Sequence, residues 1–203
     1  MPIRTAEQAR ADIGHHFGAI AELAREVHAD FRRDCRAIAP LLNSATRASI
    51  YRQIFVRKLR DYCEAAKGAH FLRKGQLCLV GLDSKYAFRV KQLSSGFGVA
   101  VSPTWASEQY DANEMPGYAA DLFDGAAEAT LLYLGWALPE NAPAEINVYL
   151  VCNDARRNPI WAIPLEGNGG DGRGIQEPLP IDGERPGGVR VRVKAPNERK
   201  ANG

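Results

Sequence analysis

Histidine and cysteine are the residues of this chain best suited to bind a metal ion, and there are four of each. They are His15, His16, His28, His70, Cys35, Cys63, Cys78 and Cys152. No two cysteines form a C-x-x-C unit, and the zinc-binding motif H-E-x-x-H is absent. Neighbouring residues on an α-helix point about 100° apart, so His15 and His16 are expected to face different ways. We therefore predict no metal site, no cofactor, and thiols that are reduced and mostly buried.

Motifs for covalent catalysis and for phosphate binding are also missing from the sequence. No G-x-S-x-G elbow is present, and Cys152 lies late in an apolar segment with no histidine assigned to it. The chain has no G-x-x-x-x-G-K-[ST] loop, and Gly96–Gly98 lacks the strand–loop–helix setting that holds a phosphate. The sequence thus predicts no catalytic residues and favours a non-enzymatic binding or regulatory protein.

A metal-dependent nuclease is the catalytic alternative. Such an enzyme needs two or three carboxylates converging on Mg²⁺ beside a lysine. Asp83 precedes an expected strand that Lys91 ends, but the position two before Lys91 is Arg89 rather than an acid. Glu64, on the preceding segment, would have to reach the same ion. Asp83 is interpreted more simply as a turn residue.

The small net charge of +2 hides a strong segregation of charge along the chain. Residues 1–91 carry 17 basic and 9 acidic residues, residues 92–188 carry 4 and 14, and residues 189–203 carry 5 and 1. Such asymmetry is typical of a protein with an anionic partner. It also fits two halves that face and neutralise each other, or charges scattered over a solvated surface.

Basic residues that can bind nucleic acid or another anionic partner gather on one expected helix and one strand face. They are Arg47, Arg52, Arg57, Lys58, Lys85, Arg89 and Lys91. Tyr51 and Tyr86 lie near them in sequence and can supply base stacking. No helix-turn-helix, zinc-finger or RNP motif accompanies them. The predicted partner is therefore another protein or nucleic acid, and a homodimer stays among the alternatives.

Two long helices are expected ahead of the other elements. Apolar residues recur at helical spacing from Ile13 to Phe31, which predicts a helix over about residues 5–37 that starts with a Thr5–Gln8 capping box. A second helix is expected over about residues 44–67, capped by Ser44 and stopped by Gly68. The spacings Arg57–Asp61 and Arg60–Glu64 predict ion pairs along its polar face.

The hydrophobic period then changes from helical to two, which predicts a sheet over about residues 71–165. A short helix is expected after Thr104. The last three expected strands, 129–138, 145–152 and 159–165, are joined by links too short for parallel crossovers. Pro159 and Pro164 place the final strand at an edge. The predicted fold class is α+β, with an N-terminal helical hairpin packed on a mostly antiparallel sheet.

Glycine and proline dominate residues 166–188, a composition typical of a flexible linker. The basic segment 189–194 alternates valine with arginine and lysine. We predict one domain over residues 1–165 and a disordered tail over residues 166–203. An interaction module that acts through the sheet edge within residues 129–165 and this tail is a further alternative.

The sequence also bears on the compartment of the protein. No apolar run approaches the ~18 residues that span a bilayer, and residues 1–5 lead into a segment without the apolar core of a signal peptide. We therefore expect a cytoplasmic protein with no membrane partner.

Three stretches within about residues 45–165 carry a resemblance. They are residues 83–93, Ser102–Trp105 with Met115–Gly117, and Leu134–Trp136 followed by Val148–Cys152 and Trp161–Leu165. Together they resemble a family of small bacterial proteins found in phage-derived or mobile regions, to which no activity is assigned. The resemblance brings no catalytic residues, and it implies a regulatory or phage–host setting.

Overall fold

The computed structural model describes residues 3–74, 77–99, 104–115, 126–139, 141–142 and 144–165. Its α-helices are α1 (Ala6–Ile13), α2 (Phe17–Asp34), α3 (Ser44–Ala65) and α4 (Trp105–Asp111), and its short 3-10 helices are η1 (Gly14–His16), η2 (Ala39–Leu41), η3 (Ser95–Phe97) and η5 (Ala126–Glu128). Its strands are β1 (Ala69–Lys74), β2 (Leu77–Leu82), β3 (Tyr86–Gln92), β4 (Thr130–Ala137), β5 (Asn147–Asn153) and β6 (Pro159–Pro164). The predicted α+β class is confirmed.

The six strands form one sheet in the order β1-β2-β3-β4-β5-β6. β3 and β4 run parallel, and the other neighbours run antiparallel. The connection over residues 93–129 is long enough for the parallel pairing, which needs a dozen or more residues. The prediction of a mostly antiparallel sheet is thus confirmed, and β6 lies at an edge as its two prolines indicate.

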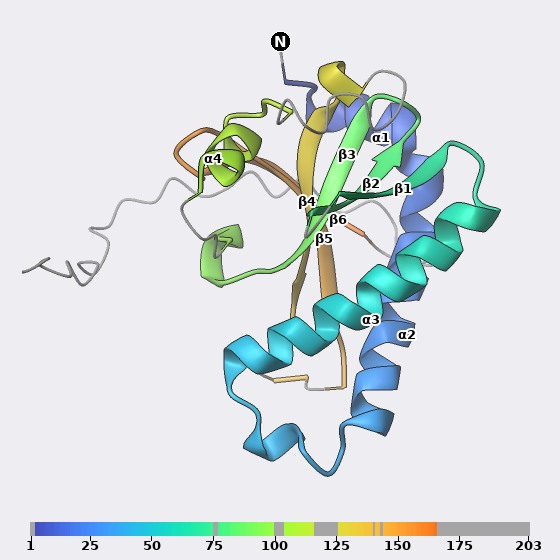
Figure 1. Ribbon diagram of the computed structural model, residues 1–203, viewed down its shortest axis with the longest axis vertical. Helices are drawn as coiled ribbons and strands as arrows, with labels where there is room; N and C mark the ends of the chain where they lie inside the picture. The colour runs from blue at the N-terminus through green and yellow to red at the C-terminus, as the bar shows by residue number, and fades with distance from the viewer. Residues whose placement is uncertain are drawn as a thin grey trace, which may run out of the picture.

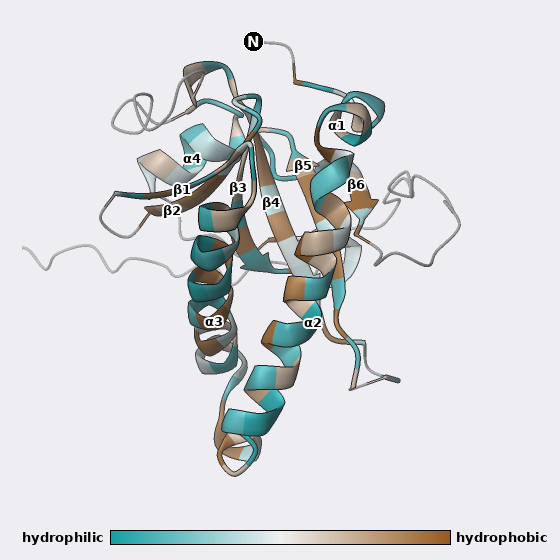
Figure 2. Ribbon diagram, turned by 90° about the vertical axis from the view of Figure 1, so that its right-hand side faces the viewer, coloured by the Kyte–Doolittle hydropathy of each residue, from teal (hydrophilic) through white to brown (hydrophobic). Residues whose placement is uncertain are grey.

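Helices cover the two faces of the sheet unequally. In Figure 1, α1, α2 and α3 lie on one face and α4 lies on the other. Figure 2 shows hydrophobic strands behind α2 and α3, whose outward turns are hydrophilic. The α2–α3 hairpin extends past the end of the sheet in both views.

Side chains of β4 alternate between the two cores. Leu132, Leu134 and Trp136 pack with the α1–α3 layer, whereas Leu131 and Tyr133 pack in the smaller cluster with Tyr110 of α4. A strand covered on both faces reads as a continuous apolar run, because its residues point alternately to each side. Helices on both faces therefore account for the apolar sequence of β4.

An aromatic stack joins α2, α3 and β4. The ring centroid of Tyr51 lies 4.3 Å from that of Phe31 and 4.3 Å from that of Trp136. The Tyr51 hydroxyl is 2.7 Å from Nδ1 of the buried His28. This hydrogen bond accounts for two polar groups inside a largely apolar core.

The first helix is not continuous, so the expectation of a single helix over residues 5–37 is wrong. The predicted Thr5–Gln8 capping box starts α1. Ile13 then leaves helical geometry (φ −118°, ψ 9°), and η1 separates α1 from α2, which ends at Asp34. Gly14 favours this break, because glycine is a poor helix former. The break lets α1 contact β6 while α2 packs against α3.

Local capping decides the other helix ends. Asn43, rather than Ser44, caps α3 by accepting a hydrogen bond from the Thr46 backbone N–H at 2.8 Å. Gly68 lies beyond the end of α3, where it adopts a positive φ of 80°. Thr104 caps α4 as expected. The predicted tail, residues 166–203 with the segment 189–194, lies outside the described residues.

Within the described residues, no helix has the length and apolar character required to cross a membrane. The four cysteines are free, with Cys152 buried and the other three partly exposed.

Candidate functional site

Two of the predicted anion-binding residues are neutralised by α2. Lys58 Nζ lies 2.9 Å from Glu26 Oε2 and 3.2 Å from Asp30 Oδ2. The hydrogen bond to Glu26 raises the pKa of Lys58. Arg57 lies 3.9 Å from Asp30, and no Arg57–Asp61 pair is found in this part of the helix. Both cations therefore serve the α2–α3 contact.

Arg47 and Lys85 are also engaged within the fold. The Arg47 guanidinium lies 3.4 Å from the carbonyl oxygen of Ala39 and 3.5 Å from that of Leu42. Lys85 Nζ donates a hydrogen bond of 2.7 Å to Asp12 Oδ1 on α1. Arg47 thus contacts the connection between α2 and α3, and Lys85 joins the β2–β3 turn to α1.

Arg52, Arg89 and Lys91 are the predicted residues that the fold brings together. Arg52 comes from α3 and the other two from β3, and all three are half-buried. Burial lowers the pKa of Lys91, and the positive charges of Arg89 and Arg52 lower it further. The Arg89 guanidinium carbon lies 5.2 Å from the ring centroid of Tyr110. Three cations thus share a partly dehydrated region of the molecule.

Asp111, which no sequence motif singles out, holds a fourth cation, Arg157, beside them. Its side chain is 1% exposed and accepts a hydrogen bond of 2.6 Å from Arg157 Nε. It also accepts one of 2.5 Å from the Tyr133 hydroxyl. Burial raises the pKa of Tyr133 well above its usual range, as does this carboxylate, whereas Arg89 and Arg157 lower it. We call Arg52, Arg89, Lys91 and Arg157 the basic cluster.

A cleft of about 1110 Å³ opens beside the basic cluster. Loop residues 92–99, the C-terminal half of α4 and the β5–β6 turn form its walls, and they include Ser94, Glu108, Asp111 and Arg157. We call it the α4 cleft. Because Arg157 belongs to both features and Asp111, its ion-pair partner, also lines the cleft, the cleft and the cluster are continuous.

The aromatic residues expected to stack on bases are not available for that role. Tyr51 and Tyr86 are both fully buried. Trp105, the first residue of α4, is 66% exposed and lies three residues before Glu108 of the cleft wall. Residues three apart share a helix face. Trp105 is therefore the aromatic side chain that the sequence interpretation missed.

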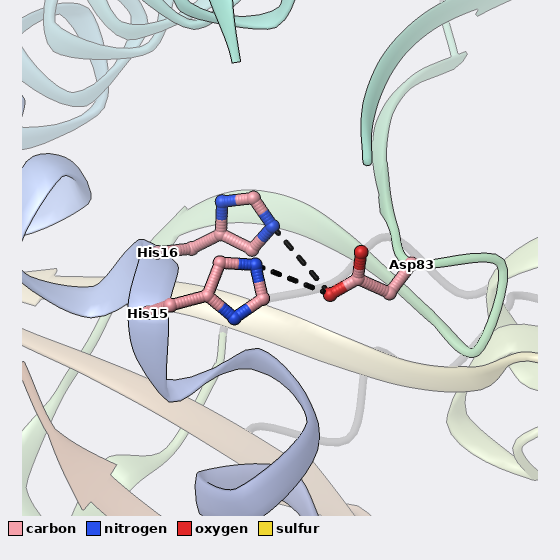
Figure 3. Close-up of side chains that lie close together, drawn as sticks. All are labelled: His15, His16 and Asp83. Carbon is pink, nitrogen blue, oxygen red and sulfur yellow. Dashed lines mark ion pairs between the residues drawn. The ribbon is translucent and has the colours of Figure 1, made fainter. Parts of the chain in front are cut away.

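A second cluster joins His15, His16 and Asp83, contrary to the expectation that the two histidines diverge. Asp83 Oδ2 lies 3.5 Å from His15 Nε2 and 3.6 Å from His16 Nε2 (Figure 3). The two ring centroids are 4.1 Å apart. The helix breaks at Ile13, so the imidazoles are not held to a regular helical wheel and both turn toward the β2–β3 turn.

The electrostatics of this cluster favour a neutral imidazole at His16. Burial lowers the pKa of His16, and the neighbouring His15 lowers it further, while Asp83 raises it. His16 Nδ1 lies 2.5 Å from the Tyr62 hydroxyl. Asp83 is a turn residue, as predicted, with a positive φ of 49°. These three side chains could also hold a metal ion.

The carboxylates needed for the alternative of a metal-dependent nuclease do not gather at Asp83 in the described part of the chain. The partners of Asp83 are histidines, and Lys91 lies at the opposite end of β3. No family model, curated protein or solved structure matches the chain. Function is therefore inferred below from geometry, and membership of the phage-associated family stays an expectation.

Proposed function

We propose that the protein is a non-enzymatic binding or regulatory protein that holds an anionic partner, nucleic acid or the acidic surface of another protein, at the basic cluster and the α4 cleft. The observation that carries this proposal is that Arg52 and Arg89 line the same small pocket between α3 and β3, and that the charges of both act on the half-buried Lys91. These residues come from elements separated in sequence, so the positive region is a product of the fold.

The electrostatic environment of Lys91 suits an anion. The positive charges of Arg89 and Arg52 lower the pKa of Lys91, whereas Asp111, which also binds Arg157, raises it. Like charges held together in a partly dehydrated place raise the free energy of the charged forms. A partner phosphate or carboxylate would lower that free energy, and the concave wall beside the cluster would strengthen the field.

The geometry of individual side chains suits a nucleic acid. The Arg89 guanidinium lies over the ring of Tyr110, a contact that would help to orient its N–H groups for phosphate oxygens. Trp105 exposes a broad apolar surface on which a base could stack, and such stacking contributes about 1–3 kcal/mol per base. Phosphate contacts with one stacked base predict binding with little sequence preference.

The proposal is tested by fluorescence anisotropy of labelled single-stranded and duplex DNA and RNA over a range of salt concentrations. We expect binding at about 50 mM salt, where phosphate contacts are strong, and a steep loss of affinity at higher salt. Replacing both Arg52 and Lys91 by glutamine should weaken binding and reduce the slope of log K against log[salt] by about 2, roughly 1 for each contact.

The matched control replaces Arg57 and Lys58 by glutamine, which removes two positive charges from α3 where they face acidic residues of α2. We expect this variant to bind as the wild type does. Absence of retention at low salt would reject nucleic acid as the partner, and an equal loss in the control variant would reject the basic cluster as the site.

The resemblance over residues 45–165 supports a phage or mobile-element setting for this binding activity. It supports no catalytic step.

A further inference from the structure

We propose that His15, His16 and Asp83 bind a divalent transition-metal ion, with zinc as the ion that fits the ligands best. The ligand atoms are His15 Nε2, His16 Nε2 and Asp83 Oδ2, and all three lie within 4.8 Å of one another. Both imidazoles point at the same carboxylate (Figure 3). This site is separate from the basic cluster and does not depend on the proposed function.

The strongest support is a pair of facing buried polar atoms, neither of which has a hydrogen-bond partner. The His16 side chain is 4% exposed, and its Nε2 has no hydrogen-bond partner. Asp83 Oδ2, which faces it, also lacks one. A buried polar group without a partner costs about 1–3 kcal/mol. A metal ion between the two atoms would satisfy both of them.

The distances are close to those of a coordination sphere. Zinc lies about 2.0–2.1 Å from histidine nitrogen and carboxylate oxygen, so two ligands of a tetrahedral ion lie roughly 3.3 Å apart. The separations of 3.5 and 3.6 Å between nitrogen and oxygen exceed this by a few tenths of an ångström. Small side-chain rotations would bring each imidazole nitrogen and the carboxylate oxygen to the separation of two zinc ligands.

The ligand types select the class of ion. Imidazole nitrogen suits zinc, copper, iron and nickel, whereas Mg²⁺ and Ca²⁺ take oxygen ligands. Two histidines with a single carboxylate are the ligand set of many zinc sites with an open position. Magnesium is thus a suitable negative control.

Two groups around the ligands fix their orientation. Tyr62 lies 2.5 Å from His16 Nδ1, and with a metal on Nε2 this nitrogen would carry the proton and donate it to the Tyr62 oxygen, as outer-shell partners of metal-bound histidines do. Gly68 contacts the other side of Asp83, because a Cβ at Gly68 would overlap Asp83 Oδ1. Glycine at this position thus leaves room for the carboxylate in its observed orientation.

The site is reachable from solvent. The side chain of His15 is 59% exposed and that of Asp83 is 29% exposed, so an ion can enter and a water molecule can complete its coordination. The histidines belong to η1 and the carboxylate to the β2–β3 turn. A bound ion would therefore link the α1–α2 junction to the sheet and stabilise the folded state.

The test uses the full chain without a polyhistidine tag, freed of metal by a chelator. Isothermal titration with Zn²⁺ should give one ion per chain, and Co²⁺ should give the visible absorption of a bound ion. Free zinc at about 100 times its Kd should raise Tm by roughly 5–10 °C. Mg²⁺ should leave Tm unchanged.

Two variants locate the ion. His15→Ala removes an exposed ligand, and Asp83→Asn keeps a residue type that tolerates positive φ, so circular dichroism should show both folded. Each should weaken zinc binding by more than the 10–100-fold that outer-shell changes cost. His70→Ala, which removes an exposed histidine of β1, is the matched control. Failure of the wild type to bind zinc, or unchanged zinc affinity in His15→Ala and Asp83→Asn, would overturn the proposal.

Discussion

Gly135 on β4 has no space for a methyl group. A Cβ at this position would lie 2.5 Å from Leu93 Cδ2 and 2.6 Å from Leu93 Cγ, and Leu93 is itself buried. We predict that Gly135→Ala lowers the free energy of unfolding by about 1–3 kcal/mol, the usual cost of overpacking a core. Urea denaturation of the variant and the wild type measures the difference.

The contact with Leu93 can be isolated by a double-mutant cycle. Leu93→Ala alone leaves a cavity and should cost about 2–5 kcal/mol. With both substitutions present, the alanine methyl occupies part of that cavity, so the combined loss should be smaller than the sum of the two. A strictly additive result would show that contact with Leu93 is not the reason why a side chain at position 135 is destabilising.

The sequence allowed only some residues of the candidate sites to be predicted. The alternation on β3 places Arg89 and Lys91 on one face, and the charges of Arg89 and of Arg52 on α3 both act on Lys91. A binding role for these three residues stays a prediction. Lys58 and Lys85 had the same sequence appearance, yet acids of α2 and α1 neutralise them. Their partners lie 32 and 73 residues away, so no local pattern could reveal them.

At the scale of elements, α1 is fastened to the sheet by one carboxylate. Asp12 accepts hydrogen bonds from Lys85 Nζ at 2.7 Å and from the Tyr86 hydroxyl at 3.0 Å. The bond from Lys85 is the main cause of the lowered pKa of Asp12. A carboxyl with a lowered pKa in the folded state stabilises the fold above its unfolded pKa of about 3.9, and this contribution is lost as the pH falls through the folded pKa.

We therefore predict that Asp12→Asn lowers the free energy of unfolding by about 1 kcal/mol at pH 7, because two hydrogen bonds to a charged acceptor are weakened in a partly exposed place. The difference from the wild type should shrink below about pH 3.9. Urea denaturation at several pH values measures both effects.

Asp61→Asn removes the same charge from a side chain that is 63% exposed. It should change stability by no more than about 0.5 kcal/mol. An Asp12→Asn deficit that stays constant down to pH 2 would contradict the role given to the ionised carboxylate.

The elements themselves were largely predictable, and the exceptions have local causes. Alternating and helical periods located the strands and the long helices, since burial on one face leaves a regular pattern. The break between α1 and α2 was not predicted, because the apolar residues on its two sides keep helical spacing across Gly14. The convergence of His15 and His16 was not predicted either. The prediction placed both residues on one continuous helix, where neighbouring side chains diverge.

In the whole molecule, the start of the chain is held by segments distant in sequence. The carbonyl oxygen of Arg4 accepts a hydrogen bond of 3.0 Å from the indole of Trp161. Its guanidinium donates to the carbonyl oxygens of Lys85 at 3.0 Å and Glu128 at 3.1 Å. Arg4 thus joins β6, the β3 entry and the β4 entry at one point.

We predict that Arg4→Ala lowers the free energy of unfolding by roughly 1–2 kcal/mol, since hydrogen bonds from a charged donor are lost. Thermal or urea denaturation should still show one transition, shifted to lower stability. Arg10→Ala, which truncates an exposed arginine of α1, should cost less than about 0.5 kcal/mol. An equal decrease in the free energy of unfolding of the two variants would show that the Arg4 hydrogen bonds do not stabilise the fold.

The single parallel pair in the sheet has a consequence for the order of folding. β1, β2 and β3 follow one another closely in the sequence, and β4, β5 and β6 are separated by at most nine residues, so each group can pair locally. The β3–β4 contact instead pairs Tyr86 with Thr130. Closing the long loop between these strands costs conformational entropy before the contacts between them can form. We expect two local meanders to form early and to dock along β3 and β4 late, so the length of the 93–129 connection should control the folding rate more than any turn within either meander.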